Sequence, residues 1–259
     1  MPKAQIDEYQ YGGAAFEACS TALHRLRRGV RNGALGRPAA REVIRLARLP
    51  QLLLRLPKMT VSLTRSPAGS AIEEHLETRR WGIPKNRIAQ AILPIPSDVE
   101  EYRRGRSRRA LRTNVRKAQS MGLVVRRLDT ASEREGAVAH FFRSGSAQMV
   151  GWESPAAWVT EMTRADDVWW AVVDGSGDPA ALAALTIDVQ WAMLIALVSL
   201  NAPARWLVHS YVTETLVEAD VSYLCLNAPN ALLEEPGNQY FQQLLGYRVA
   251  HLSLDNGDG

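Results

Sequence analysis

From residue 88 onward, short apolar runs alternate with segments in which apolar residues recur at helical spacing. The run "IAQAILPIP" (88–96) is typical of a strand and ends at two prolines. Ser97 and Asp98 can cap the helix that follows, which the sequence predicts to continue until Gly122. A basic helix between two strands is therefore the first regular unit of this part of the chain.

The later segments are separated by turn residues, such as the "DGSGDP" stretch that marks a hairpin-type turn. Strands are predicted over 123–128, 168–175, 179–190, 191–202, 221–229 and 247–254, and helices over 131–150, 155–164, 204–220 and 238–246. This order of strands and helices predicts one mixed α/β domain over residues 84–259.

Residues 1–83 have a different pattern and are predicted to form a basic, helical N-terminal extension, broken near 33–38. Within it, "REVIRLARLPQLLLRLPK" (41–58) alternates Arg with Leu, Val and Ile. A basic amphipathic helix of this kind packs its apolar stripe on its own domain or lies on an anionic membrane surface. Packing is the commoner outcome, and a peripheral contact with a membrane stays open.

The charge of the chain is distributed unevenly. Its 259 residues have a formal net charge of +4, but residues 1–130 hold 26 Lys and Arg against 11 Asp and Glu, whereas residues 131–259 hold 5 against 16. Such asymmetry indicates either two halves that attract one another, an anionic partner at the basic half, or a solvated basic face.

Composition also excludes several classes of protein. Two cysteines, Cys19 and Cys225, provide no disulfide framework, and five scattered histidines provide no metal site. No apolar stretch is long enough to span a membrane, and no N-terminal signal peptide is recognisable. We therefore expect a cytoplasmic protein without a bound metal.

Four stretches together resemble the GCN5-related N-acetyltransferase (GNAT) superfamily, in the branch related to Fem-type peptidoglycan aminoacyltransferases. They are "YRRGRSRRALRTNVRKAQSMGLVV", "VWWAVVDGSGDPAALAALTIDVQWAMLIALVSL", "PARWLVHSYVTETLVEADVSYLCL" and "YFQQLLGYRV". The resemblance covers residues 88–254. It implies a mostly antiparallel, twisted sheet flanked by helices, and transfer of an acyl group from acyl-CoA, most readily acetyl-CoA, to an amine.

The resemblance also implies where the cofactor binds. Family members wrap the pyrophosphate of coenzyme A with a glycine-rich loop, but the matching stretch here, "NAPARWLVHS", contains no glycine. A helix N-terminus can still bind an anion through its unpaired backbone amides. The resemblance implies two groups of cofactor-binding residues. Val198 and Leu200 lie at the strand end, where a backbone amide polarises the thioester, and Ala204, Arg205, Trp206 and Leu207 lie at the helix start, where the phosphates bind. The alternative is an ordinary helix start.

The catalytic groups are less clearly marked. The family's tyrosine acid aligns with Gln242, and Tyr240 lies two positions away on another helix face. Candidates for proton transfer are Tyr240, Asp188 and Ser199, with His209 also considered as a base. Each has a structural alternative, and Cys225 is expected to be a buried small apolar residue and not a nucleophile.

Eight basic side chains lie between Arg103 and Lys117, with no acidic one among them. Arg104, Arg108 and Arg112 are spaced at i, i+4 and i+8 and, with Glu153, are candidates to bind the acceptor or an anion. Three functions follow: an acyl-CoA-dependent N-acyltransferase acting on a small molecule or peptide, an aminoacyl-tRNA-dependent Fem-like transferase, or a non-catalytic binding module. Fem-type relatives usually contain two such domains, so the single domain here favours acyl-CoA over tRNA.

Overall fold

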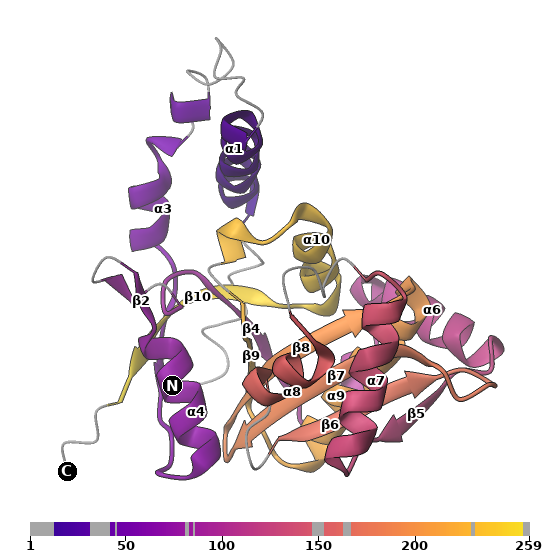
Figure 1. The fold of residues 1–259 in the computed structure, drawn as a ribbon. Coiled ribbons are helices and arrows are strands. Elements are labelled where there is room, and N and C mark those ends of the chain that lie inside the picture. The colour runs from indigo at the N-terminus through magenta and orange to yellow at the C-terminus, as the bar shows by residue number, and fades with distance from the viewer. Residues whose placement is uncertain are drawn as a thin grey trace. The chain divides into compact units, whose positions relative to one another are not determined.

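The structure, a computed structural model, describes residues 13–31, 42–44, 46–80, 83–84, 86–146, 153–162, 167–228 and 231–255 (Figure 1). The chain divides into two compact units. Unit 1 is formed from residues 1–62, 73–94 and 228–259, and unit 2 from residues 63–72 and 95–227.

Unit 2 contains five strands in the order β9-β8-β7-β6-β5. Their bounds are β5 (Val124–Arg127), β6 (Val168–Val173), β7 (Pro179–Asp188), β8 (Trp191–Ser199) and β9 (Tyr223–Leu226). Neighbouring strands are antiparallel, apart from the parallel pair of β8 and β9. The predicted mixed, mostly antiparallel α/β sheet is confirmed.

Helices cover both faces of this sheet. They are α5 (Val99–Arg103), α6 (Arg109–Ser120), α7 (Ala131–Arg143), α8 (Pro155–Met162) and α9 (Ala202–Glu218). Figure 1 shows α7 and α8 on the near face and α9 on the far face, where α6 packs against α9. Because both faces are covered, β7 is buried along most of its length, which explains its nearly uninterrupted apolar sequence.

Aromatic side chains fill the core on the α7 and α8 side. Trp169 of β6 is fully buried and meets Trp158 of α8 edge-to-face, with ring centroids 5.8 Å apart. The guanidinium of Arg134 lies 5.6 Å from the centroid of the Trp169 ring. These contacts bury two of the largest apolar side chains of unit 2 and so contribute strongly to its stability.

Unit 1 combines helices with five further strands. Its elements are α1 (Gly13–Arg31), α3 (Leu49–Leu54), β1 (Lys58–Val61), β2 (Arg79–Arg80), β3 (Ile83–Pro84), β4 (Gln90–Pro94), α10 (Pro236–Leu245) and β10 (Arg248–Leu254); α4 (Pro67–Glu77) has residues in both units. β10 pairs in parallel with β1 and antiparallel with β4.

The first 83 residues therefore differ from the basic, helical extension that the sequence predicts. β1 pairs with β10 from the opposite end of the chain, with Lys58 opposite His251 and Val61 opposite Leu254. Prolines at positions 50 and 57 favour helix ends but carry no information about this long-range pairing. The predicted break at 33–38 lies outside the described residues.

Helix α7 begins at a complete capping box. Thr130 Oγ1 accepts a hydrogen bond from Glu133 N–H at 3.2 Å, and Glu133 Oε2 accepts one from Thr130 N–H at 3.1 Å. These hydrogen bonds lower the pKa of Glu133. Two otherwise unpaired helix donors are thus satisfied reciprocally.

We expect Thr130→Ala to lower the free energy of unfolding by about 1 kcal/mol, because it removes the side-chain cap of α7. Urea unfolding followed by tryptophan fluorescence measures this change. Thr113→Ala, at an exposed position within α6, is the matched control and should have little effect. Equal stability of the two variants would contradict a role for the capping box.

Candidate functional site

The basic segment predicted as one helix is broken into two. Asp98 caps α5 by accepting hydrogen bonds from the N–H groups of Glu100 and Glu101 at 3.0 and 3.3 Å, as the sequence predicts. α5 ends at Arg103, Gly105 adopts a φ of 86°, and α6 begins after a short 3-10 turn. Glycine adopts this left-handed conformation at little cost, so Gly105 is where the chain can turn.

This break corrects the predicted arginine row. Arg104 follows the end of α5, whereas Arg108 ends the 3-10 turn and Arg112 lies within α6. The spacing i, i+4, i+8 places side chains on one face only within a continuous helix. The three arginines therefore do not form one helical row.

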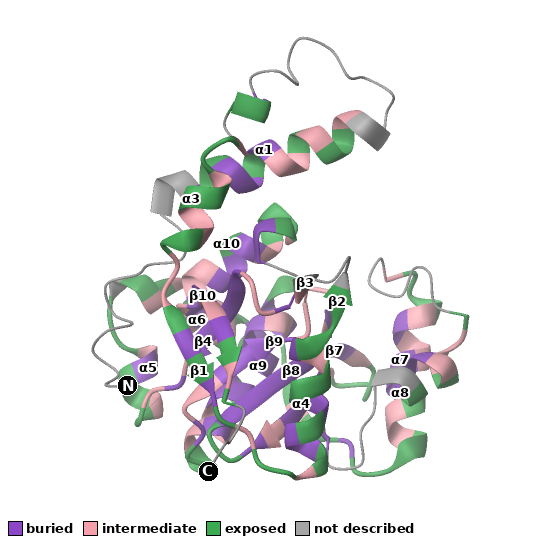
Figure 2. Cartoon of the chain, turned by 90° about the vertical axis from the view of Figure 1, so that its left-hand side faces the viewer, coloured by how far each residue is buried: buried purple, intermediate pink, exposed green. Residues whose placement is uncertain are grey.

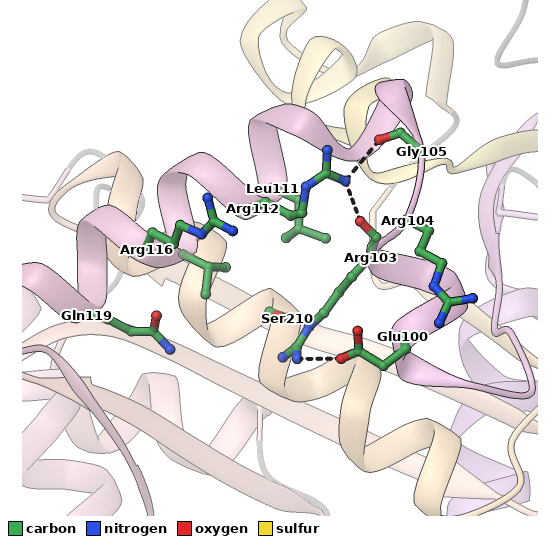
Figure 3. Close-up of a pocket in the computed structure, with 10 residues that line it drawn as sticks. Glu100, Arg103, Arg104, Gly105, Leu111, Arg112, Arg116, Gln119 and Ser210 are labelled. Atoms are coloured by element: carbon green, nitrogen blue, oxygen red, sulfur yellow. Dashed lines mark hydrogen bonds and ion pairs between the residues drawn. The ribbon is translucent and has the colours of Figure 1, made fainter.

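A cavity of about 440 Å³ opens at the break. It is lined by Glu100, Arg103, Arg104, Gly105, Leu111, Arg112, Val115, Arg116, Gln119 and Ser210, which belong to α5, the break, α6 and α9 (Figure 3). Four of these side chains are arginines and one is a carboxylate. The cavity is therefore strongly cationic, and it suits an anionic ligand.

Two of the predicted arginines have structural contacts. Arg112 Nη1 donates to the backbone oxygen of Gly105 at 2.9 Å and to that of Arg103 (Figure 3). The guanidinium of Arg108 lies 5.0 Å from the centroid of the buried Tyr102 ring and does not line the cavity. Arg112 thus stabilises the turn between α5 and α6 by binding its backbone oxygens. Arg108 packs on the Tyr102 ring.

A polar network connects α5 to α9. Arg103 forms ion pairs with Glu214 of α9 and, at 3.4 Å, with Glu100. Ser210 Oγ donates to the same Glu214 oxygen at 3.0 Å. Among the described residues, no ion-pair partner is found for Arg104 or Arg116, which are both exposed. These two guanidinium groups are therefore the ones best placed to receive a ligand.

Two buried groups beside this network do not titrate near neutral pH. Burial raises the pKa of Tyr102 to about 12. Burial lowers the pKa of His209 to about 3, and the positive charges of Arg205 and Arg108 lower it further. His209 is therefore a neutral, enclosed imidazole, which argues against its role as a general base.

The start of α9 is already capped by the protein. Asn201 Oδ1 accepts a hydrogen bond from Ala204 N–H at 2.9 Å, and Arg205 N–H donates to Asn201 O at 3.3 Å. Ala204, Trp206 and Leu207 are buried. The predicted diphosphate site at the Ala204 amide is corrected accordingly, because a side chain of the protein occupies that donor.

The strand ends predicted to form the oxyanion region are partly paired. The described register of β8 with β9 ends where Leu194 lies opposite Leu226, whereas β8 stays paired with β7 as far as Ser199. Leu200 N–H donates to Ala180 O at 2.9 Å, which assigns this amide to the β7 side. Val198 is buried and Ser199 is half-buried, and a catalytic role for either stays a prediction.

Asp188 is a structural residue and not an available base. Its carboxylate accepts hydrogen bonds from Thr64 N–H and Ser66 Oγ, both at 2.8 Å, and from the Thr64 hydroxyl. Close packing here requires glycine at position 69, where a Cβ atom would lie 2.2 Å from Thr64 O. Asp188 therefore anchors residues 63–72 to the end of β7, which corrects its assignment as a catalytic candidate.

The remaining candidates do not line the cavity. Tyr240 lies on α10 in unit 1 with 63% of its surface exposed, and the neighbouring Gln242 is buried. Glu153 is exposed in the loop before α8. Burial raises the pKa of Cys225 to about 12, in agreement with its expected role as a small apolar residue.

The sequence did not single out Arg103, Arg116 and Ser210 as site residues. Arg116 belongs to the basic run and continues the i, i+4 spacing after Arg112, but the predicted row ended at Arg112. Ser210 and Glu214 are spaced at i, i+4 on α9, which is a signal for a shared helix face. Their contact with α5 depends on tertiary packing, which no local pattern encodes.

No family model matches the chain, and a search of curated proteins finds no match. Among solved structures, the C-terminal domain of a putative lysylphosphatidylglycerol synthetase from Agrobacterium fabrum is 14% identical, with a TM-score of 0.41, 62% of this chain and 58% of that chain being covered. L-PGS from Bacillus licheniformis is 13% identical, with a TM-score of 0.43 and coverages of 62% and 57%.

FemX is also 13% identical, with a TM-score of 0.49, and the match covers 68% of this chain and 63% of FemX. This chain thus matches less than two thirds of the length of each of these three proteins. Identities and TM-scores at this level assign no activity. The function is therefore argued from the chain's own residues.

We expect His209 to make the protein less stable in mild acid. The folded protein keeps this imidazole neutral down to a pKa of about 3, whereas the unfolded chain binds a proton near the usual value of 6.5. Since the unfolded state then binds more protons, stability falls with decreasing pH, by up to about 1.4 kcal/mol for each pH unit below 6.5.

Urea unfolding of wild type and His209→Gln between about pH 5 and pH 7.5 measures this contribution. The variant should have a flatter pH dependence whatever its absolute stability, because glutamine does not titrate. His140→Gln, at a partly exposed histidine of α7, controls for loss of any imidazole. An unchanged slope in His209→Gln would contradict the neutral state of His209.

Proposed function

We propose that the chain is an N-acyltransferase whose acyl donor is held through its phosphate groups, with acyl-CoA as the donor and acetyl-CoA as the first choice. The observation that carries this proposal is the arginine-lined cavity of unit 2. Its volume of about 440 Å³ lies within the range of small-molecule sites. An amine of a small molecule or a peptide is the proposed acceptor.

The exposed arginines replace the helix start as the proposed phosphate site. The Ala204 amide is occupied by Asn201, whereas Arg104 and Arg116 line the cavity. A guanidinium binds phosphate oxygens through charge-assisted, bidentate hydrogen bonds. The phosphates of the donor are therefore assigned to these two residues.

Helix α9 connects this cavity to the end of β8. α9 begins at Ala202, and Ser210, which lines the cavity, lies eight residues further along. At 1.5 Å per residue, the two positions are about 12 Å apart along the helix axis. A long, flexible arm such as pantetheine can bridge this separation, with phosphates in the cavity and the thioester near the end of β8.

In the proposed reaction, a neutral amine attacks the thioester carbonyl, the tetrahedral intermediate forms, and the C–S bond breaks. The proton that the amine nitrogen loses passes through water to the leaving thiolate. Backbone amides near the end of β8 are the proposed partners of the developing oxyanion. Leu200 is excluded from this role by its hydrogen bond to Ala180. Val198 lies two residues before Leu200 in the same antiparallel ladder, opposite Leu182, so its N–H also faces β7. Ser199 is the position that we propose for this role.

A second candidate function is transfer from an aminoacyl-tRNA. Basic side chains are also exposed outside the cavity, on Arg109 and Lys117 of α6. An exposed basic helix suits contacts to a nucleic-acid backbone, which are made to phosphates and are independent of sequence. A non-catalytic binding module is the third possibility, and turnover with any amine would exclude it.

We expect coenzyme A and acetyl-CoA to bind, and Arg104→Ala combined with Arg116→Ala to weaken this binding at least tenfold. The reason is the loss of charged hydrogen bonds, each contributing about 1.5–3 kcal/mol. Isothermal titration calorimetry measures the affinity. Arg143→Ala, at an exposed arginine at the end of α7, is the matched control. Absence of binding at millimolar ligand would contradict the acyl-CoA proposal.

The tRNA alternative has a different signature. If tRNA is the donor, its affinity should fall steeply with salt concentration, and the same double variant should reduce the slope of log K against log salt by about one per lost phosphate contact. Filter binding across a salt series measures this slope. A salt-independent affinity, or a double variant with the wild-type slope, would exclude the arginines as a tRNA site.

A further inference from the structure

Helix α3 and the residues before it expose aliphatic side chains in unit 1. Leu54 is 82% exposed and Ile44 is 71% exposed, the highest values among the large apolar side chains of the described chain. Figure 2 shows α3 in the colours of exposed and intermediate residues, and none of its residues is buried. A short apolar helix normally covers its leucines against its own domain, and α3 does so only in part.

A cavity of about 630 Å³ lies between α1 and α3, which are side by side in Figures 1 and 2. It is lined by Ala18, Cys19, Ile44, Arg48, Gln51, Leu52 and Arg55. The side chains from α1 are small, Leu52 and Ile44 are aliphatic, and the two arginines provide the charge. The cavity thus combines an apolar lining with cationic groups.

Positive charge predominates around this surface, although α1 also contains the exposed Glu17. Arg48, Arg55 and Lys58 are exposed, and α1 adds the exposed Arg27 and Arg28. Among the described residues from 42 to 58, the only carboxylate is Glu42, which is buried and paired with Arg25 at 3.0 Å. Exposed aliphatic groups are therefore accompanied by an excess of positive charge.

We propose that this basic-aliphatic surface, formed by residues 42–44 and 46–58 and the exposed basic side chains of α1, binds the anionic phospholipid surface of a membrane. Aliphatic side chains that enter the headgroup region and arginines that pair with lipid phosphates are the two contributions that hold interfacial helices. The contact is peripheral: among the described residues, no helix combines the length and apolarity that crossing a bilayer requires.

Charge complementarity favours a lipid surface over a protein partner. A flat array of phosphates can meet all the arginines at once and also admits Leu54 and Ile44 into the acyl region. A protein partner would need carboxylates placed opposite each arginine around an apolar pocket. A second copy of this chain presents the same positive charges, so self-association through this surface is opposed by like-charge repulsion.

The test is sedimentation of the full-length protein with vesicles. We expect binding to vesicles of phosphatidylglycerol and phosphatidylcholine, much weaker binding to vesicles of phosphatidylcholine alone, and a decrease in binding with added salt. Ile44→Asp combined with Leu54→Asp should lower partitioning at least tenfold. Arg48→Gln combined with Arg55→Gln should lower binding to the anionic vesicles specifically.

The matched control is Val189→Asp, which places the same charge at a 66% exposed valine in the turn after β7 of unit 2. It should bind vesicles as the wild type does. Thermal unfolding of each variant should be unchanged, since all the substituted side chains are exposed. Titration of the same variants with acetyl-CoA separates this proposal from the transferase proposal, because the cavity residues of unit 2 are untouched.

Three outcomes would overturn the proposal. They are equal binding to neutral and anionic vesicles, vesicle binding that survives the Ile44 and Leu54 substitutions, and no binding to any vesicle. Size-exclusion chromatography completes the test: a wild-type dimer that the Leu54→Asp substitution dissociates would assign the surface to a second copy of the chain instead.

Discussion

The ion pair between Arg103 and Glu214 is the interaction on which the cationic cavity depends. It joins α5 to α9 across 111 residues of sequence, and Ser210 donates to the same carboxylate. Because both partners are partly exposed, solvent screening reduces its energy, and its main effect is geometric. It fixes the end of α5 against α9, so that the turn at Gly105 directs Arg104 and α6 around a hollow instead of continuing one helix.

Much of the sheet was predictable because its strands are both apolar and clearly punctuated. β6, β7 and β8 follow from runs of buried residues separated by a Gly- and Asp-rich turn, and the α9 helix follows from the pattern after it. The pairing of β1 with β10 was not predictable, since it joins short segments nearly 200 residues apart. No local sequence pattern in either segment indicates its partner strand.

The site was less predictable than the fold, for a physical reason. Residue type and spacing indicated which side chains carry charge, but not which of those charges the protein uses internally. Asp188 was an attractive base by position, yet donors from residues 63–72 enclose it. Arg112 and Arg108 belonged to the expected row, yet one binds backbone oxygens and the other packs on Tyr102. Only tertiary contacts distinguish these arginines from Arg104 and Arg116.

The described part of unit 2 provides few groups that could transfer a proton in the proposed reaction. The residues that line the cavity include one carboxylate and no histidine or tyrosine. The nearby buried groups do not titrate near neutral pH, because Tyr102 has a pKa of about 12 and His209 has a pKa of about 3. The proposed transferase therefore relies on binding and orientation, whose contribution to rate can be large without any acid or base. The amine must then reach the thioester already neutral, so the acceptor's own basicity, and not a tuned side chain, governs how the reaction responds to pH.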